Sequence, residues 1–277
     1  MKLGSFKVDG LETYGTGRTN SVLPVSKKFR QTYPNLLTAI SSEAIQEMEF
    51  GDAVETEKVE FLPPIPNPKK IICAGLNYTK VYPIDLPMPK VPVEPVVFAR
   101  FSDSFVGDGS DLHIPTGEAA HTYDYEGEIV AVIGKPMWKV SETDAQSHIF
   151  GYSIMNEGSV RGHQKHSIHA GKNFYRSGSW GPWIIPVSEA HPISDMYLET
   201  HVNGSLRQST RGDQMLFSLT RILSYLSYLY PLSPGDVIAT GSPEGSGGSL
   251  SPPHFLLSGD TVSVSVSSLG TLTNLVR

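Results

Sequence analysis

The sequence predicts an α+β fold in which β-strands predominate, and three observations lead to this prediction. Short runs rich in β-branched residues recur along the chain, each bounded by glycine or proline. The 277 residues include 26 Gly and 21 Pro, scattered along the chain as tight turns between strands require. Only two segments in the second half carry a clear helical pattern behind a capping residue. We therefore expect a mostly β core with a smaller helical component.

The first 68 residues differ from the rest and predict a small N-terminal α/β domain. Alternation over residues 2–8, a turn at Asp9-Gly10 and a returning segment over 11–14 predict a β-hairpin. Residues 35–49 carry apolar side chains at irregular helical spacing and predict a helix. Four prolines within residues 61–68 predict an extended linker, because proline fixes φ and removes a backbone donor. We place the domain boundary there, with the second domain over 69–277.

The second domain contains a series of predicted strands. A strand over 70–74 ends at Gly75 and is followed by a proline-rich loop over 83–95, which is either a lid or a plain surface loop. Ser141 predicts the start of a helix over 142–148, and Asp213 the start of one over 214–230. The remaining strands are expected at residues 96–100, 125–133, 149–155, 183–186, 198–202, 237–240 and 261–266.

The net charge and the single cysteine limit the kinds of binding partner and the cellular compartment that we expect. A net charge of −6 favours neither nucleic acid nor an anionic membrane as partner. The single Cys73 excludes an internal disulfide, and within its apolar run it is expected to be a buried small side chain rather than a nucleophile. No run reaches the roughly 18 apolar residues of a membrane helix, and the N-terminus shows no signal-peptide pattern. We expect a cytoplasmic protein.

The most informative segment is the predicted strand that begins near Asp124 and ends at Gly134. Side chains in a strand alternate between faces, so Glu126 and Glu128 should point the same way. Two adjacent carboxylates that lead into an apolar strand repel each other and resist desolvation, and a divalent cation would relieve both costs. Hard ions such as Mg²⁺ prefer such oxygen ligands. The alternative is a solvated strand end with two unrelated surface acids.

A third acid, Glu157, strengthens the metal hypothesis. It follows directly after another apolar strand, so it is placed to meet the first pair across the sheet. Three carboxylates around one divalent ion leave a slightly anionic site, so nearby cations should help to bind an acidic substrate. The candidate cations are Arg100, Arg161 and Lys172, each of which is equally suited to an ordinary surface ion pair.

From residue 69 onward the sequence resembles the fumarylacetoacetate hydrolase superfamily, in particular its shorter bacterial members. The resemblance rests on eight segments in the same order and spacing, which are KIICAGLNY, PVVFARFSDSFVGDG, DYEGEIVAVIGKP, GYSIMNEGSVRGHQ, GKNFYRSGSWGPWIIP, VNGSLRQ, PGDVIATGSPEGSG and PPHFLLSGDTVSVSVSSLGTLTN. It implies a mixed β-roll catalytic domain with a metal at its mouth. It also implies a homodimer.

The resemblance assigns roles to individual residues. The metal ligands of the family fall on Glu126, Glu128 and Glu157, where the third is usually Asp, and the ion would be Mg²⁺, Mn²⁺ or Ca²⁺. The Gln and Lys with which the family contacts its substrate fall on Gln164 and Lys172, and its Gly-Thr pair falls on Gly241 and Ser242. Apart from the resemblance, we expect Arg100, already named as a candidate cation, and Tyr78 to bind the substrate. The backbone N–H and hydroxyl of Gly241-Ser242 are suited to a carboxylate or an oxyanion.

One departure from the family pattern bears on the reaction. Many members carry a His and a Glu that activate water shortly after the G-x-N-Y motif, but here those positions hold Val81 and Ile84. Among His163, His166 and His169, we favour His166 as a replacement base, since histidine titrates near neutral pH. The glycine-rich run over 241–249 lacks the G-K-[ST] ending of a phosphate loop and predicts a turn-rich wall of the site.

These observations predict a metal-dependent enzyme that acts on a 1,3-dicarbonyl or 2-oxo acid through an enolate. Hydrolytic C–C cleavage of an acylpyruvate-like substrate is the default reaction of the family. Decarboxylation and keto–enol isomerisation need no activated water, so the loss of the His and Glu favours them as alternatives. A further alternative is a catalytically silent binding protein that keeps only the fold.

Overall fold

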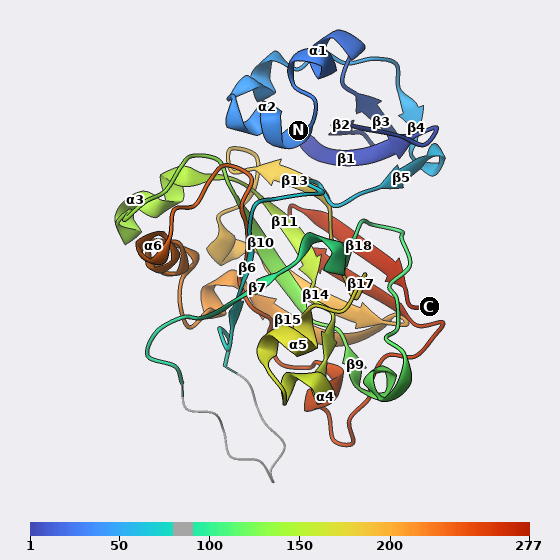
Figure 1. The fold of residues 1–277 in the computed structure, drawn as a ribbon, viewed down its shortest axis with the longest axis vertical. Coiled ribbons are helices and arrows are strands. Elements are labelled where there is room, and N and C mark those ends of the chain that lie inside the picture. Colours follow the sequence, from blue (N-terminus) through green and yellow to red (C-terminus); the bar gives the residue numbers. More distant parts are fainter. Residues whose placement is uncertain (80–90) are drawn as a thin grey trace.

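The computed structural model of the chain describes residues 1–79 and 91–277. Val81 and Ile84 lie outside these residues, as does most of the predicted loop over 83–95. The fold is mostly β, as predicted, and Figure 1 shows a small N-terminal unit above a larger body. Among the described residues, no helix is long and apolar enough to cross a membrane.

The N-terminal unit contains the predicted hairpin. Its strands β1 and β2 pair along their whole length around the Asp9-Gly10 turn, where both residues have positive φ. The expected helix over 35–49 is shorter, because the chain breaks at Glu43 with φ of 56° and continues as a single 3₁₀ turn. The elements of this unit are β1 Lys2–Val8, β2 Leu11–Gly17, β3 Ser21–Pro24, α1 Lys27–Thr32, α2 Leu36–Ser41, β4 Val54–Glu55 and β5 Val59–Phe61.

The proline-rich segment after β5 is packed against the body rather than free. Ile65 is buried in the same apolar cluster as Leu3, Trp180 and Ile184. In addition, β1 pairs with a strand of the body through Leu3 and Ile184, so the N-terminal strands extend the central sheet. The domain boundary at residue 68 stays a prediction.

The body is built around the central sheet and a second, smaller sheet. The central sheet has 12 strands among the described residues, and its main path runs β4-β3-β2-β1-β13-β11-β10-β16-β6-β7. The strands of the body in this sheet are β6 Ile71–Gly75, β7 Val96–Arg100, β8 Phe105–Val106, β10 Gly127–Ile133, β11 Ile149–Asn156, β13 Gly178–Pro186 and β16 Val237–Ala239.

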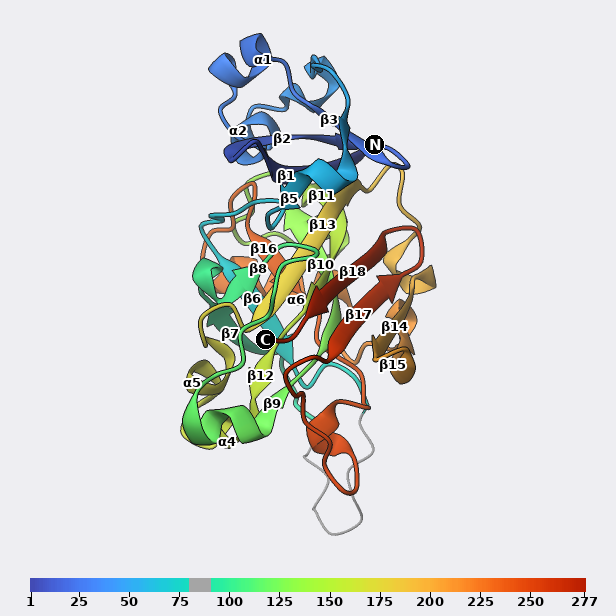
Figure 2. The ribbon, with the colours of Figure 1, turned by 90° about the vertical axis from the view of Figure 1, so that its right-hand side faces the viewer.

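The second sheet covers one face of the central sheet, as Figure 2 shows. Apolar side chains of both sheets and of α6 form one core, with Ile129, Leu198 and Ile222 at less than 2% exposure. A two-stranded ribbon of β9 Tyr123–Asp124 and β12 Ser159–Val160 lies beside the site described below. The second sheet comprises β14 Tyr197–Val202, β15 Ser205–Arg211, β17 Thr261–Val266 and β18 Gly270–Leu275, and the helices of the body are α3 Glu142–Ala145, α4 Arg161–Gln164, α5 Ile168–Lys172 and α6 Leu219–Leu229.

The starts of the two helices predicted for the body were not predicted equally well. Ser141 caps α3 by accepting a hydrogen bond from the Asp144 backbone N–H, as expected. The helix expected over 214–230 begins only at Leu219, because the hydroxyl of Ser218 accepts the Arg221 backbone N–H and so caps the helix at that point.

The apolar cluster that joins the N-terminal unit to the body leads to a prediction about the free energy of unfolding. We expect Leu3→Ala to lower the free energy of unfolding of the whole protein by about 2–5 kcal/mol, because it opens a cavity between β1 and β13. Denaturant unfolding, followed by tryptophan fluorescence, measures the effect. Leu11→Ala is the matched control, since that side chain is 67% exposed. A loss of stability equal to that of the control would contradict the prediction.

Candidate metal centre

The pairing of β10 with β11 brings the predicted acids together. In this antiparallel pair Gly127 lies opposite Asn156, so Glu126 and Glu157 are neighbours where the strands meet the pocket. The Glu157 backbone N–H donates to the Glu126 carbonyl at 2.7 Å, and the Glu126 N–H donates to the Asn156 side chain at 3.1 Å. These bonds fix the distance between two carboxylates that the sequence separates by 31 positions.

The glycine between the first two acids is needed for close packing. A Cβ at Gly127 would lie 2.1 Å from the Thr200 hydroxyl of β14, so no other residue fits there without a shift. Glu126 and Glu128 accordingly both face the pocket, as the alternation predicted.

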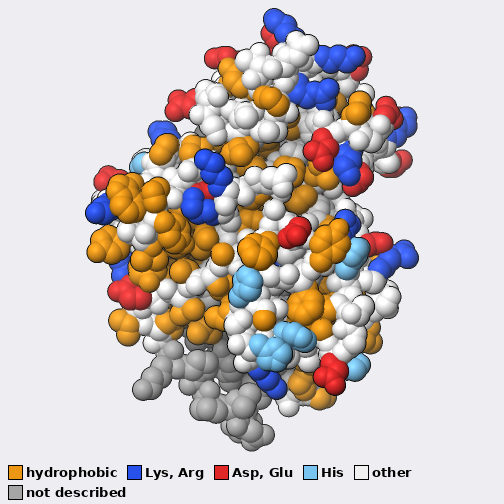
Figure 3. Space-filling view, in the orientation of Figure 1, with side chains coloured by type: hydrophobic (Ala, Val, Ile, Leu, Met, Phe, Trp, Pro, Cys, Tyr) orange, Lys and Arg blue, Asp and Glu red, His pale blue; other side chains and the backbone are white. Residues whose placement is uncertain are grey.

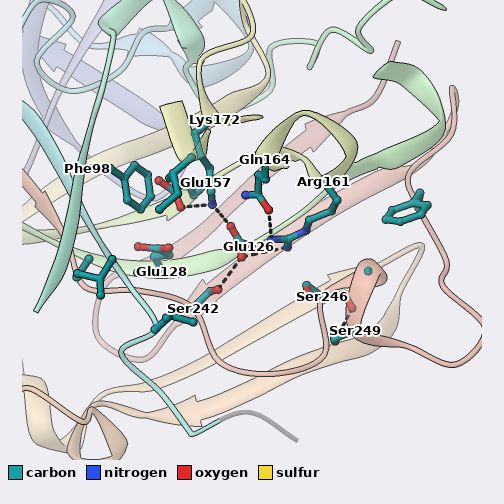
Figure 4. Close-up of a pocket in the computed structure, with 17 residues that line it drawn as sticks. Phe98, Glu126, Glu128, Glu157, Arg161, Gln164, Lys172, Ser242, Ser246 and Ser249 are labelled. Carbon is teal, nitrogen blue, oxygen red and sulfur yellow. Dashed lines mark hydrogen bonds and ion pairs between the residues drawn. The ribbon is translucent and has the colours of Figure 1, made fainter. Parts of the chain in front are cut away.

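The three acids form one cluster, which Figure 4 shows at the floor of the pocket. One carboxylate oxygen from each of Glu126, Glu128 and Glu157 lies within 4.8 Å of the others. Their exposed fractions are 4%, 1% and 1%. The predicted convergence is thus confirmed, and the alternative of a solvated strand end is wrong.

Burial makes this cluster electrostatically costly. Desolvation, followed by repulsion from Glu157, raises the pKa of Glu128 well above its usual value. The Gly241 backbone N–H donates to Glu128 at 2.8 Å and offsets part of this cost. Gly241 adopts φ of 96°, a conformation that favours glycine, and this turn directs its N–H toward the carboxylate.

Two cations compensate the acids. The Lys172 ammonium contacts both Glu126 and Glu157, and Arg161 lies 3.0 Å from Glu126. Burial alone would lower the pKa of Lys172, but the attraction of Glu126 and Glu157 outweighs it and raises that pKa. Glu126 also accepts hydrogen bonds from the hydroxyls of Ser159 at 2.8 Å and Ser242 at 3.2 Å.

The donor set fits a hard divalent cation. It offers carboxylate oxygens in a buried cluster, which is the ligand type that Mg²⁺ and Mn²⁺ prefer. One oxygen, Oε1 of Glu157, is buried without a hydrogen-bond partner. A bound ion would supply the partner that this oxygen lacks. The identity of the metal stays a prediction.

The acids open into a cavity of about 430 Å³. One wall is apolar, and Figure 4 shows Phe98 beside the acids. The opposite wall is polar and is formed by α4 and the glycine-rich run over 241–249, which therefore is a wall of the site as predicted. The apolar residues are Ala74, Leu76, Val96, Phe98, Ile168 and Phe255, and the polar ones, apart from the acids, are Arg161, Gln164, Lys172, Ser242, Ser246 and Ser249.

Some of the other predicted site residues line this cavity and others do not. Lys172, Gln164 and Ser242 line it, and Gly241 contributes its N–H to Glu128 just behind the wall. Tyr78 is not among the residues that line it. Its side chain is buried, and burial raises the pKa of its hydroxyl.

Arg100 lies behind the cluster and does not face the cavity. Its guanidinium donates to the Gly158 carbonyl at 3.1 Å and to the hydroxyls of Ser104 and Ser177, and it stacks on Phe105. Arg100 thus supports the turn after Glu157. The sequence predicted instead that Arg100 binds the substrate, and its placement behind the cluster does not fit that role.

His166 is exposed at the surface and does not line the cavity. Its ring stacks edge-on against His163, with the ring centroids 5.1 Å apart. Figure 3 shows histidine side chains on the face of the molecule where α4 and α5 lie. The placement of His166 does not fit its predicted role as the base.

Two residues of the site were missed by the sequence reasoning. Ser159 binds Glu126, and Asp124 binds Arg161 through a 2.7 Å ion pair. Each lies two positions from a predicted ligand, but the strands are interrupted at residues 125–126 and 157–158, so strand alternation does not predict their contacts.

Comparison with known proteins gives consistent matches over the body of the chain. The sequence profile described as "Fumarylacetoacetate (FAA) hydrolase C-terminal" matches residues 70–277. An oxaloacetate tautomerase of Bacillus subtilis is 37% identical over 221 residues, which cover 78% of this chain and 73% of the relative. A mitochondrial oxaloacetate tautomerase of Xenopus laevis is 34% identical and covers 78% of this chain and 68% of its own length.

Solved structures match the whole chain. A fumarylacetoacetate hydrolase from Exiguobacterium antarcticum superposes with a TM-score of 0.85 and 31% identity, over 100% of this chain and 99% of that one. A 5-carboxymethyl-2-hydroxymuconate delta-isomerase from Mycobacterium smegmatis gives 0.78 and 28%, over 100% and 98%. The relatives named here are thus enzymes, two of them tautomerases, one an isomerase and one a hydrolase.

The position of Lys172 makes a prediction about the metal-free protein. We expect Lys172→Met to lower its free energy of unfolding by about 3–5 kcal/mol, because the substitution leaves buried carboxylates without their counter-charge. Saturating Mg²⁺ should restore much of that loss, since the ion supplies positive charge at the same carboxylates.

Thermal unfolding with and without Mg²⁺ measures both effects. Lys165→Met, at an exposed position nearby, is the control and should change stability by no more than about 0.5 kcal/mol. The prediction is wrong if Mg²⁺ stabilises the Lys172 variant no more than it stabilises the unsubstituted protein.

Proposed function

This chain belongs to the fumarylacetoacetate hydrolase family, and from that premise we propose that it is a metal-dependent keto–enol tautomerase of a small 2-oxo acid such as oxaloacetate. The observation that carries the proposal is the buried acidic cluster at the floor of a cavity whose described walls hold cations, an amide and hydroxyls, but no histidine. The tautomerase relatives from Bacillus subtilis and Xenopus laevis support the same reaction.

The lack of a His and a Glu at the two positions where many family members carry them favours tautomerisation over hydrolysis. Val81 and Ile84 carry no titratable group, although both positions lie outside the described residues. No histidine lines the cavity within residues 1–79 and 91–277. Hydrolysis requires a base that removes a proton from water so that the water can attack, whereas tautomerisation consumes no water and only exchanges protons between the substrate and a positioned acid or base.

The residues of the cavity suit an enolate. Among the described residues that line the cavity, Lys172 carries the ammonium group suited to donate a proton, and its contacts with Glu126 and Glu157 hold it at the cavity floor. In ketonisation, the ammonium would deliver a proton to C3 and become an amine, and the proton released by the enol hydroxyl would pass through solvent to that amine and restore the ammonium. The composition of the substrate is unchanged and no water is consumed. A bound divalent ion would stabilise the negative charge on the enolate oxygen.

Gln164 and the polar wall are suited to orient the substrate carboxylate. The Gln164 side-chain oxygen lies 3.5 Å from Arg161, so its amide NH₂ group is the end suited to donate to a carboxylate. Ser242, Ser246 and Ser249 add hydroxyl groups on the same side of the cavity.

We also keep three proposals that rest on the sequence and the family. The partner is a small oxo acid and not nucleic acid or a membrane, the assembly is a homodimer, and the location is the cytoplasm.

The acidic cluster makes a prediction about turnover. We expect Glu128→Gln to slow metal-dependent ketonisation of oxaloacetate by at least about 100-fold, because it keeps the shape of a ligand and removes its charge. Loss of enol absorbance in stopped flow measures the rate. Chelation with EDTA should have an equal effect on the unsubstituted protein, and exposed Glu118→Gln should have none. Full activity after exhaustive chelation would refute the metal requirement.

The type of reaction is tested with several substrates in deuterated solvent. We expect metal-dependent deuterium uptake at C3 of oxaloacetate, followed by mass spectrometry, at a rate well above the cleavage of any acylpyruvate. A dominant product that has gained water would identify a hydrolase, and loss of CO₂ a decarboxylase. No turnover of any member of the panel would favour a silent binding protein.

A further inference from the structure

Asp124 is a buried carboxylate beside the acidic cluster but separate from it. It ends β9, has no exposed surface and is not among the residues that line the cavity. Its Oδ1 accepts the backbone N–H groups of Gly247 at 2.7 Å and Tyr125 at 2.9 Å. Its Oδ2 accepts Nε of Arg161 at 2.7 Å and the N–H of Gly248 at 2.9 Å. Both oxygens are therefore fully used.

These donors belong to the two parts of the polar wall. Arg161 comes from α4, and Gly247 and Gly248 come from the glycine-rich run that also supplies Ser246 and Ser249. In Figure 4 Arg161 and these serines lie on the same side of the cavity, with Glu126 between Arg161 and Ser242. One carboxylate thus joins two segments that lie about 86 positions apart in the sequence.

The contact between Asp124 and the glycine-rich run is too close for a side chain. A Cβ at Gly247 would lie 2.9 Å from Oδ1 of Asp124 and 2.0 Å from the His254 carbonyl oxygen. The backbone amides therefore reach the carboxylate directly, as charge-assisted hydrogen bonds that are stronger than neutral ones.

The ion pair with Arg161 also sets the direction of that side chain. With Nε held by Asp124, the guanidinium places Nη2 3.0 Å from Glu126. Burial alone would lower the pKa of Arg161, but the attraction of Glu126 and Asp124 outweighs it and raises that pKa. An arginine that is free to rotate loses rotamer entropy when it binds a ligand, whereas an arginine already held by Asp124 has lost that entropy before the ligand binds.

We propose that Asp124 is a positioning residue, which holds Arg161 and the glycine-rich run in the shape that receives the oxo acid. The proposal rests on the proposed function in that the ligand is the same 2-oxo acid. Asp124 acts through Arg161 and the amides of Gly247 and Gly248, and it contributes no ligand to the metal.

Asp124→Asn tests this role. Asparagine keeps the shape of the side chain, but its NH₂ group replaces one oxygen and faces two of the four donors, whose hydrogen bonds are then lost. We expect the KM for oxaloacetate to rise by about tenfold or more. Affinity for Mn²⁺ should stay within about twofold, since the acidic cluster keeps its charge. Hydrogen exchange of the peptide over 245–250 should become faster.

Asp236→Asn is the matched control. Asp236 is equally buried, pairs with Lys70 at 3.0 Å and accepts the Ser233 N–H, but it lies away from the cavity lining. This control should change neither KM nor exchange over 245–250. Equal effects in both variants would reduce Asp124 to a general structural role and overturn the proposal.

A double substitution tests the route through Arg161. If Asp124 acts through that side chain, Asp124→Asn combined with Arg161→Gln should raise KM no further than Arg161→Gln alone, whereas additive effects would overturn the proposal. Should Asp124→Asn fail to fold, Gly247→Ala separates the run from Asp124 and should give the same rise in KM and in exchange, with Gly51→Ala as control. Unchanged KM and exchange in Gly247→Ala would overturn it.

The exchange measurement also separates this inference from the proposed function. If the unsubstituted protein turns over no oxo acid, the proposed function fails. Faster exchange over 245–250 in Asp124→Asn, and not in Asp236→Asn, would still support the positioning of the wall, and unchanged exchange would overturn it.

Discussion

Three carboxylates held within 4.8 Å of one another in a buried site form the constraint on which this structure depends. Such a cluster is unfavourable by itself, because each charge loses water and repels the others. The protein compensates with four groups, namely the Lys172 ammonium of α5, the Arg161 guanidinium of α4, the Ser159 hydroxyl of β12 and the Gly241 N–H. The site is thus a balance of charges that the fold has to maintain, and a divalent ion fits that balance.

The fold maintains it mainly through the register of β10 and β11. Hydrogen bonds between these strands fix Glu126 beside Glu157, and the second sheet packs so closely behind them that only glycine fits at position 127. Apolar residues of both sheets fill the space beneath, so the strands have little freedom to slide. The cavity above is then lined by polar side chains from α4, α5 and the glycine-rich run.

Much of this arrangement could be predicted from local patterns. The alternation around Gly127 and the position of Glu157 after an apolar strand were sufficient to bring three ligands together. Cys73 is buried in the core, as its apolar run indicated. These predictions succeed because strand periodicity and burial depend on neighbours in the sequence.

The residues that local patterns could not assign depend on contacts between distant segments. Arg100 reads as a cation free to bind substrate, but its hydrogen-bond partner Ser177 is 77 positions away. His166 has the right chemistry for a base, yet the turn between α4 and α5 leaves it at the surface. Asp124 looked like part of a polar strand start, and only the return of the chain at Gly247 and Gly248 gives it a role.

The most direct test of the account is a calorimetric titration of the metal-free protein with Mn²⁺. We predict one ion bound per chain, with binding lost when Glu126, Glu128 and Glu157 are all replaced by Gln while circular dichroism shows that the fold is kept. The absence of binding to the unsubstituted protein, or unchanged binding to the triple variant, would contradict the claim that these carboxylates form a metal centre.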